Sequence, residues 1–81
     1  MRVSNFNNVK NQFIIEDGAK TIFQSYNTII AIKENDKIIL DCNKWDYSRT
    51  TAKHRNKFTG LTTKETQKQI DNGTIKLQNL N

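Results

Sequence analysis

The residues of this chain whose types could do chemistry are few and far apart. Its one histidine, His54, and its one cysteine, Cys42, lie on different predicted elements. Neither Ser25 nor Ser48 sits in a glycine-flanked turn of the kind that exposes a nucleophilic serine. A structural zinc site needs about four histidine or cysteine ligands, and no glycine-rich loop is present to hold a phosphate. We therefore expect no catalytic residue, no metal and no cofactor, and a protein that is not an enzyme.

The chain's surplus of positive charge is confined to one segment, residues 44–68. That segment holds seven basic and two acidic residues, a surplus equal to the net charge of +5 of the whole chain. No acidic residue occurs between Tyr47 and Lys64. Charge concentrated on one element attracts a polyanion, whereas scattered charge mainly confers solubility. The segment is therefore the predicted binding region.

Periodicity predicts that the part of this segment from Tyr47 onward is an amphipathic helix ended by Gly60. The apolar seam recurs at spacings of four and three residues and consists of Tyr47, Thr51, His54, Phe58 and Leu61. Steps of 100° place Arg49, Lys53 and Asn56 within about 60° of one another, opposite Phe58. The predicted residues for binding nucleic acid or another partner are Arg49, Lys53, Arg55, Asn56 and Lys57, with Arg55 on a flank of the polar side.

Two interpretations of the polar side stay open. It can neutralise about three or four phosphates of RNA or DNA, or it can be a solvated face that keeps a small protein soluble. The absence of acid favours binding, because solubilising faces usually mix signs. His54, on the apolar seam, is more typical of a packed, hydrogen-bonded core residue than of a general base.

Three aromatic residues allow a similar choice. Trp45, Tyr47 and Tyr26 can stack on unpaired bases, as in single-strand recognition. For Trp45 and Tyr47 a place in the core is favoured, because they precede the helix where it must dock on the sheet.

The rest of the chain must position this helix, and its pattern predicts a small α+β domain. Strands are expected at residues 12–16, 20–26, 28–33, 37–42 and 74–77, with 34–36 as a hairpin turn. A second helix is expected from Thr62 to Ile70, because Thr62 and Glu65 form a capping box. The fold class is thus an antiparallel sheet of three to five strands against two short helices, in one domain spanning 1–81 with residues 1–11 loosely ordered.

Composition and apolar runs indicate the compartment. No run approaches the about 20 apolar residues that span a bilayer, and the N-terminus lacks the apolar core of a secretory signal. A lone cysteine suits a reducing compartment. We expect a cytoplasmic protein with no membrane contact, and a homodimer through an unpaired hairpin edge is an open possibility.

The stretches Phe23–Ala31 and Trp45–Phe58, above all the segment WDYSRTTAKH, resemble small phage and prophage proteins of low-GC bacteria. The resemblance runs from about Phe23 to Leu80. It implies a mobile-element origin, and chains of this size on such elements include inhibitors of host defence, among them anti-CRISPR proteins. The partner would then be a host nucleoprotein complex. The alternative is a stand-alone nucleic-acid-binding module without a dedicated protein target.

Overall fold

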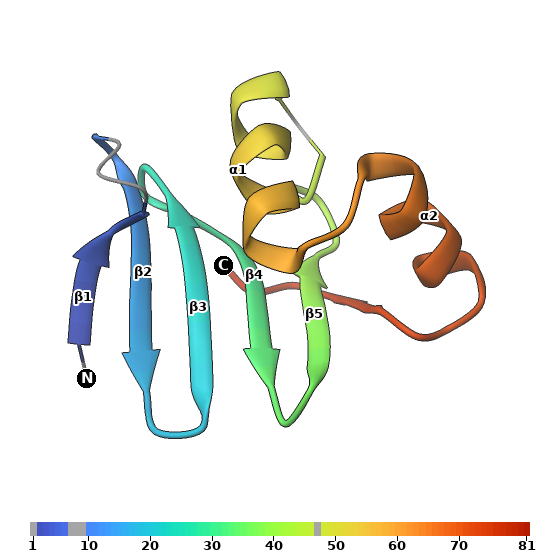
Figure 1. The fold of residues 1–81 in the computed structure, drawn as a ribbon, viewed down its shortest axis with the longest axis horizontal. Helices are drawn as coiled ribbons and strands as arrows, with labels where there is room; N and C mark the ends of the chain where they lie inside the picture. The colour runs from blue at the N-terminus through green and yellow to red at the C-terminus, as the bar shows by residue number, and fades with distance from the viewer. Residues whose placement is uncertain (1, 7–9, 47) are drawn as a thin grey trace.

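The computed structural model describes residues 2–6, 10–46 and 48–81, which form an α+β fold (Figure 1). One mixed sheet of six strands, in the order β1-β2-β3-β4-β5-β6, is accompanied by two helices. The strands are β1 Arg2–Asn5, β2 Gln12–Asp17, β3 Lys20–Ser25, β4 Thr28–Glu34, β5 Lys37–Asp41 and β6 Lys76–Gln78, and the helices are α1 Arg49–Thr59 and α2 Thr63–Asp71. The predicted class is confirmed, with one strand more than the upper expectation.

Neighbouring strands from β1 to β5 pair antiparallel, and short turns join β2 to β3, β3 to β4 and β4 to β5. The turn between β4 and β5 has positive φ at both central residues, Asn35 (51°) and Asp36 (64°). That geometry matches the right-handed twist of the flanking strands, and asparagine and aspartate tolerate it better than most residues. The predicted hairpin at residues 34–36 is confirmed.

The two ends of the chain differ from expectation. Residues 2–5 form β1, paired with β2, where only loose order was expected; residues 1 and 7–9 lie outside the described residues. All four β1 residues are exposed, so β1 has no burial pattern that would reveal it in the sequence. The last strand, β6, runs parallel to β5, so the sheet is mixed and not wholly antiparallel.

The core lies between the sheet and α1. Its buried residues are Phe23, Ile30, Ala31, Leu40, Phe58 and Ile75. The register of β3 and β4 shifts at Phe23/Gln24, and a bulge of this kind lets the consecutive residues Ile30 and Ala31 both be buried. The Phe23 and Phe58 rings stack with centroids 5.7 Å apart, which fixes α1 over β3.

A buried polar contact and the C-terminal residues complete the frame. Ser25 Oγ and Thr51 Oγ1 lie 3.3 Å apart at the α1–β3 contact. The Asn81 side chain accepts from the Ile29 backbone N–H at 2.8 Å and donates to its carbonyl at 3.0 Å. These two hydrogen bonds attach the C-terminal residue to β4.

Candidate polyanion-binding surface

The helix that carries the basic residues is bounded by local signals. Ser48 is the N-cap of α1, and its Oγ accepts from the Thr51 backbone N–H at 3.1 Å. Gly60 closes the helix in the left-handed conformation (φ 77°), with its N–H bonded to the Asn56 carbonyl. The predicted helix is confirmed from Arg49 onward; Tyr47, the first residue of the predicted seam, lies outside the described residues.

Three cations follow one another along the exposed side of α1. Arg49, Lys53 and Lys57 are all exposed, and each is four residues, or about 6 Å of helix rise, from the next. We call these three residues the basic stripe. The opposite side holds the buried residues Thr51, His54, Arg55 and Phe58. The predicted helical phase is thus correct for the three stripe residues.

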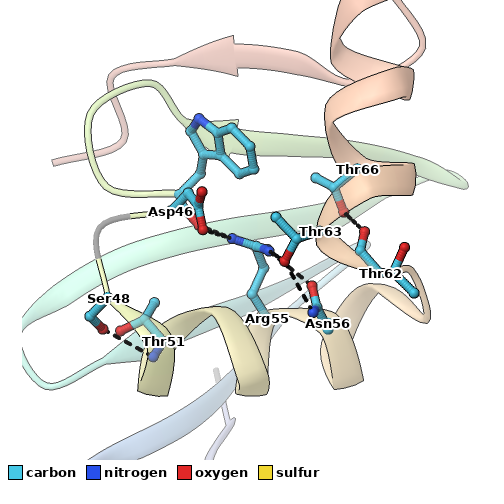
Figure 2. Close-up of polar contacts among 9 residues, drawn as sticks. Asp46, Ser48, Thr51, Arg55, Asn56, Thr62, Thr63 and Thr66 are labelled. Carbon is cyan, nitrogen blue, oxygen red and sulfur yellow. Dashed lines mark hydrogen bonds and ion pairs between the residues drawn. The ribbon is translucent and has the colours of Figure 1, made fainter.

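Arg55 is not part of this exposed surface, because its side chain is fully buried. The expectation of a solvated flank is wrong for this residue. Its guanidinium donates to the Trp45 carbonyl. It also donates to Asp46 Oδ1 at 3.2 Å and to Thr63 Oγ1 at 2.8 Å (Figure 2). Arginine's planar fork suits several acceptors at once. Arg55 therefore joins the loop before α1 to the start of α2, and it cannot contact a partner without unfolding.

Asn56 belongs to the same network and not to the open face. It is partly buried, and its Oδ1 accepts from Arg55 Nη2 at 2.9 Å while its Nδ2 lies 3.3 Å from Thr63 Oγ1. Figure 2 shows the Asn56 side chain turned toward Thr63 beside the Arg55 guanidinium. Its first role is to hold Arg55. Whether Asn56 also reaches a partner stays a prediction.

The network also includes Asp46, the acidic residue that precedes α1 in the sequence. Asp46 forms the ion pair with Arg55 at 3.2 Å, and that carboxylate neutralises the buried guanidinium.

Helix electrostatics separate the three stripe residues. Arg49 is the first residue of α1, whose first turn holds no acid, and Lys57 lies in the last turn. A cation is unfavourable at the positive N-terminal end of a helix dipole and favourable at the C-terminal end, by about 0.3–1 kcal/mol. A contribution to helix stability therefore explains why a cation stands at position 57, but not why one stands at position 49.

The aromatic candidates fall into different environments. Trp45 is partly buried, packs against the core and lies 5.0 Å from the Arg55 guanidinium carbon. Tyr26, in the β3–β4 turn, is 55% exposed. The favoured core position of Trp45 is therefore seen, and among the described residues Tyr26 is an exposed aromatic side chain. Tyr47 lies outside the described residues.

His54 is buried, as its place on the apolar seam predicts, with the Phe6 ring edge-on at 6.2 Å. Its Nδ1 atom is buried and has no hydrogen-bond partner. Desolvation, followed by the charges of Lys53 and Lys57, lowers the pKa of His54 below its ordinary value of 6.5. The imidazole is therefore buried and neutral at neutral pH.

Other reactive groups are not brought together. Among the described residues, no three histidine, cysteine or acidic side chains form a group that could hold a metal. Cys42 is exposed. Sequence reasoning missed the structural role of Asp41, which lies at the end of β5. Its buried carboxylate accepts from the Leu80 N–H at 2.7 Å and from the Asn43 N–H at 3.2 Å. Burial opposes its ionisation, but these hydrogen bonds outweigh that effect and lower the pKa of Asp41.

Comparison with known proteins places the chain in a family. Residues 2–73 match a family of unknown function, DUF8033, and because the match covers most of the chain, the protein belongs to that family. Neither the curated proteins nor the solved structures contain a match. Within the described residues, no helix is long and apolar enough to cross a membrane. The family has no assigned activity, so the functional argument depends on the surface itself.

Proposed function

We propose that this protein acts by binding a polyanion, a nucleic acid either free or within a nucleoprotein complex, and that it does so without catalysis. The observation that carries the proposal is the basic stripe: Arg49, Lys53 and Lys57 exposed in one line on α1, within a stretch that holds no acid from Tyr47 to Lys64. Arg49 strengthens the case, because its position works against helix stability.

The size of the stripe sets the contact it can make. Three cations spread over about 12 Å of helix face about three phosphates, given one phosphate per 3.4 Å of rise on each strand. Neutralising three phosphates releases counterions, so log affinity should fall against log salt with a slope of roughly −2 to −3. This is a modest, sequence-independent contact.

Rigidity supports the same proposal. Arg55 ties α1 to the preceding loop and to α2 through Trp45, Asp46 and Thr63, so the backbone beneath the stripe is fixed before any partner arrives. A preorganised surface loses less entropy on binding. Tyr26, exposed in the β3–β4 turn, is the ring available for base stacking if the partner is single-stranded.

Charge reversal on the stripe tests the proposal. We expect the double variant Arg49→Glu/Lys53→Glu to lose binding to labelled random-sequence DNA and RNA, single- and double-stranded, in fluorescence anisotropy at low salt. Its melting temperature should stay nearly unchanged, because both residues are exposed. The matched control, Lys10→Glu/Lys76→Glu, changes the net charge equally at exposed positions off the stripe. Equal losses in both variants, or binding retained by the stripe variant, would refute the proposal.

The phage resemblance supplies the more specific version, in which the protein inhibits a host defence complex that targets nucleic acids, as anti-CRISPR proteins do. The experiment that separates it from a stand-alone module is capture of partners from a bacterial lysate with and without nuclease. A stoichiometric, nuclease-resistant and salt-tolerant complex supports the inhibitor, because shape-matched protein contacts depend less on counterion release. Nuclease-sensitive capture supports the module.

A further inference from the structure

The face of the sheet opposite α1 carries an apolar row that crosses five strands in register. The paired residues from β1 to β5 are Val3, Ile15, Ile22, Ile32 and Ile39. We call this set the apolar row. Side chains directly opposite in antiparallel pairs lie on the same face about 5 Å apart, so the row is continuous across the sheet.

The apolar row is not covered by the helices. Phe23 on β3, which stacks on Phe58 of α1, and Leu40 on β5 are fully buried in the core. They alternate with Ile22 and Ile39, which point to the other face. The four isoleucines of the row are partly exposed and Val3 is 58% exposed. None of these described residues belongs to the core cluster or packs against it. Monomeric proteins seldom expose so continuous an apolar strip.

A second row, on the same face, lies next to the apolar row at the hairpin ends. Its register-paired members, in order from β2 to β5, are Asp17, Lys20, Glu34 and Lys37. We call these four the charged row. Their signs alternate strictly, and among the described residues the recorded ion pair is Arg55–Asp46, so none of the four is held in an ion pair within the chain.

We propose that this face binds a second copy of the same chain, through a two-fold axis that runs along the strands between β3 and β4. That rotation reverses the strand order, so it sets Lys20 against Glu34 of the second copy and Asp17 against Lys37 of the second copy. All four contacts then join opposite charges. The same rotation sets Ile22 against Ile32 and Ile15 against Ile39, so the apolar rows meet each other.

The charged row is what selects this arrangement. A two-fold axis across the strands would bring it against the opposite end of the face, where Phe13 and Gln24 lie, and would leave the four charges unpaired. Aligned sheets pack at about −30° because each sheet is twisted, so the pairs nearest the axis, Lys20 with Glu34, meet most closely. A self-complementary surface of this kind is what a two-fold dimer requires.

The size of the face sets the expected strength. Five strands about 4.8 Å apart and about 20 Å long present roughly 500 Å² per copy, or about 1,000 Å² in total. That total lies near the lower limit for a specific interface, about 1,000–1,200 Å². The dimer is therefore reversible and concentration-dependent. The basic stripe, on the other side of the sheet, stays exposed in it, and the inference does not rest on the polyanion proposal.

Sedimentation equilibrium over a range of protein concentrations tests the contact. We expect a monomer–dimer equilibrium in the wild type, and we expect Ile22→Lys to abolish dimerisation because it buries a charge at the centre of the apolar row. The matched control is Leu77→Lys, since Leu77 is similarly apolar and 39% exposed but pairs in register with the helix-side residue Leu40. The control should dimerise like the wild type.

Two charge variants test the symmetry itself. In Lys20→Glu and in Glu34→Lys, each homodimer sets like charges against each other twice, so we expect each to dissociate at least about fivefold more readily than the wild type. An equimolar mixture should recover wild-type association, because the heterodimer restores opposite charges at both positions. Each chain in the mixture keeps its own like-charged β3–β4 pair, so recovery reports the contact between copies and not a repaired fold.

Three results would overturn the inference. The first is a wild-type chain that stays monomeric up to about 1 mM, the range of a very weak complex, which would assign the apolar row to a different occupant. The second is a dimer unaffected by Ile22→Lys, and the third is a mixture of the two charge variants that associates no better than either variant alone.

Discussion

The two sides of α1 hold cations under opposite conditions. Lys53 is exposed, whereas Arg55, two residues later, is fully buried with hydrogen bonds to the loop before α1 and to α2. A buried cation without partners is very costly, so its acceptors must come with the fold. An exposed cation contributes little to stability and is free for other uses. The four cations of α1 therefore differ in role. Arg55 holds the neighbouring loop and α2 in place, whereas the three residues of the basic stripe are exposed to solvent.

The sharpest way to break this comparison is to remove Arg55. Arg55→Met should destabilise the fold by about 2 kcal/mol, because it leaves the Trp45 carbonyl and Thr63 Oγ1 without their shared donor. For a domain of this size that lowers the melting temperature by about 10 °C or more. Chemical denaturation measures the loss, and Lys53→Met is the matched control, with an expected change within about 0.5 kcal/mol. Similar losses in the two variants would mean that the two sides of α1 do not differ as described.

Arg55→Lys refines the same test. A lysine keeps the charge but loses the planar fork that reaches several acceptors. We expect its stability to lie between those of the wild type and Arg55→Met. If instead Arg55→Lys is as stable as the wild type, a positive charge alone is sufficient at this site and the hydrogen-bond geometry of arginine is not required.

This contrast also shows what local sequence signals can predict. The Gly60 C-cap of α1, the capping box of α2, the seam residues Thr51, His54 and Phe58, and the turn at Asn35 and Asp36 depend on residues a few positions apart, and each is predicted correctly. The N-cap of α1, Ser48, was not predicted. The burial of Arg55 depends on acceptors from two other elements, eight to ten residues away. Its position on a helical flank fits burial and exposure equally well, so helical phase alone cannot decide between them.

Local sequence signals likewise mark some strands of the sheet and not others. Strands β2 to β5 have apolar runs and turn residues that mark them, whereas β1 is fully exposed and is held by pairing with β2. The parallel placement of β6 beside β5 follows from where α2 returns the chain. The apolar row is hidden in the sequence because Ile14-Ile15 and Ile29 to Ile32 read as continuous runs, and only the register separates their two faces.

A second prediction concerns the inner side of α1 and uses pH. The pKa of His54 is lowered by burial and then by the charges of Lys53 and Lys57, so as pH falls below 6.5 the unfolded chain takes up a proton before the folded one. Stability linked to His54 is therefore complete above pH 6.5 and is lost as pH falls from there toward the folded-state pKa. Melting temperatures at pH 7 and pH 5 should show a decrease that is smaller in His54→Gln.

Asp41 provides an internal reference for that experiment. Hydrogen bonds lower its pKa below 3.8 despite its burial, so its contribution is lost only as pH falls below that value toward the folded-state pKa. The two groups therefore act in separate pH windows. A pH dependence between 7 and 5 that is identical in the wild type and in His54→Gln would show that His54 is not held neutral by the fold.

The smallest expected effect separates function from helix stability along the stripe. Arg49→Gln removes a cation from the positive end of α1 and should raise stability by about 0.3–0.5 kcal/mol, whereas Lys57→Gln removes one from the last turn and should lower it by a similar amount. Affinity for nucleic acid should fall in both, with the salt slope reduced by about one unit. Stability and binding then move in opposite directions for Arg49 and together for Lys57. If Arg49→Gln leaves binding unchanged while stabilising the helix, Arg49 is an unfavourable surface charge without a use, and the stripe shortens to two lysines, too few to distinguish a binding surface from an ordinary solvated helix.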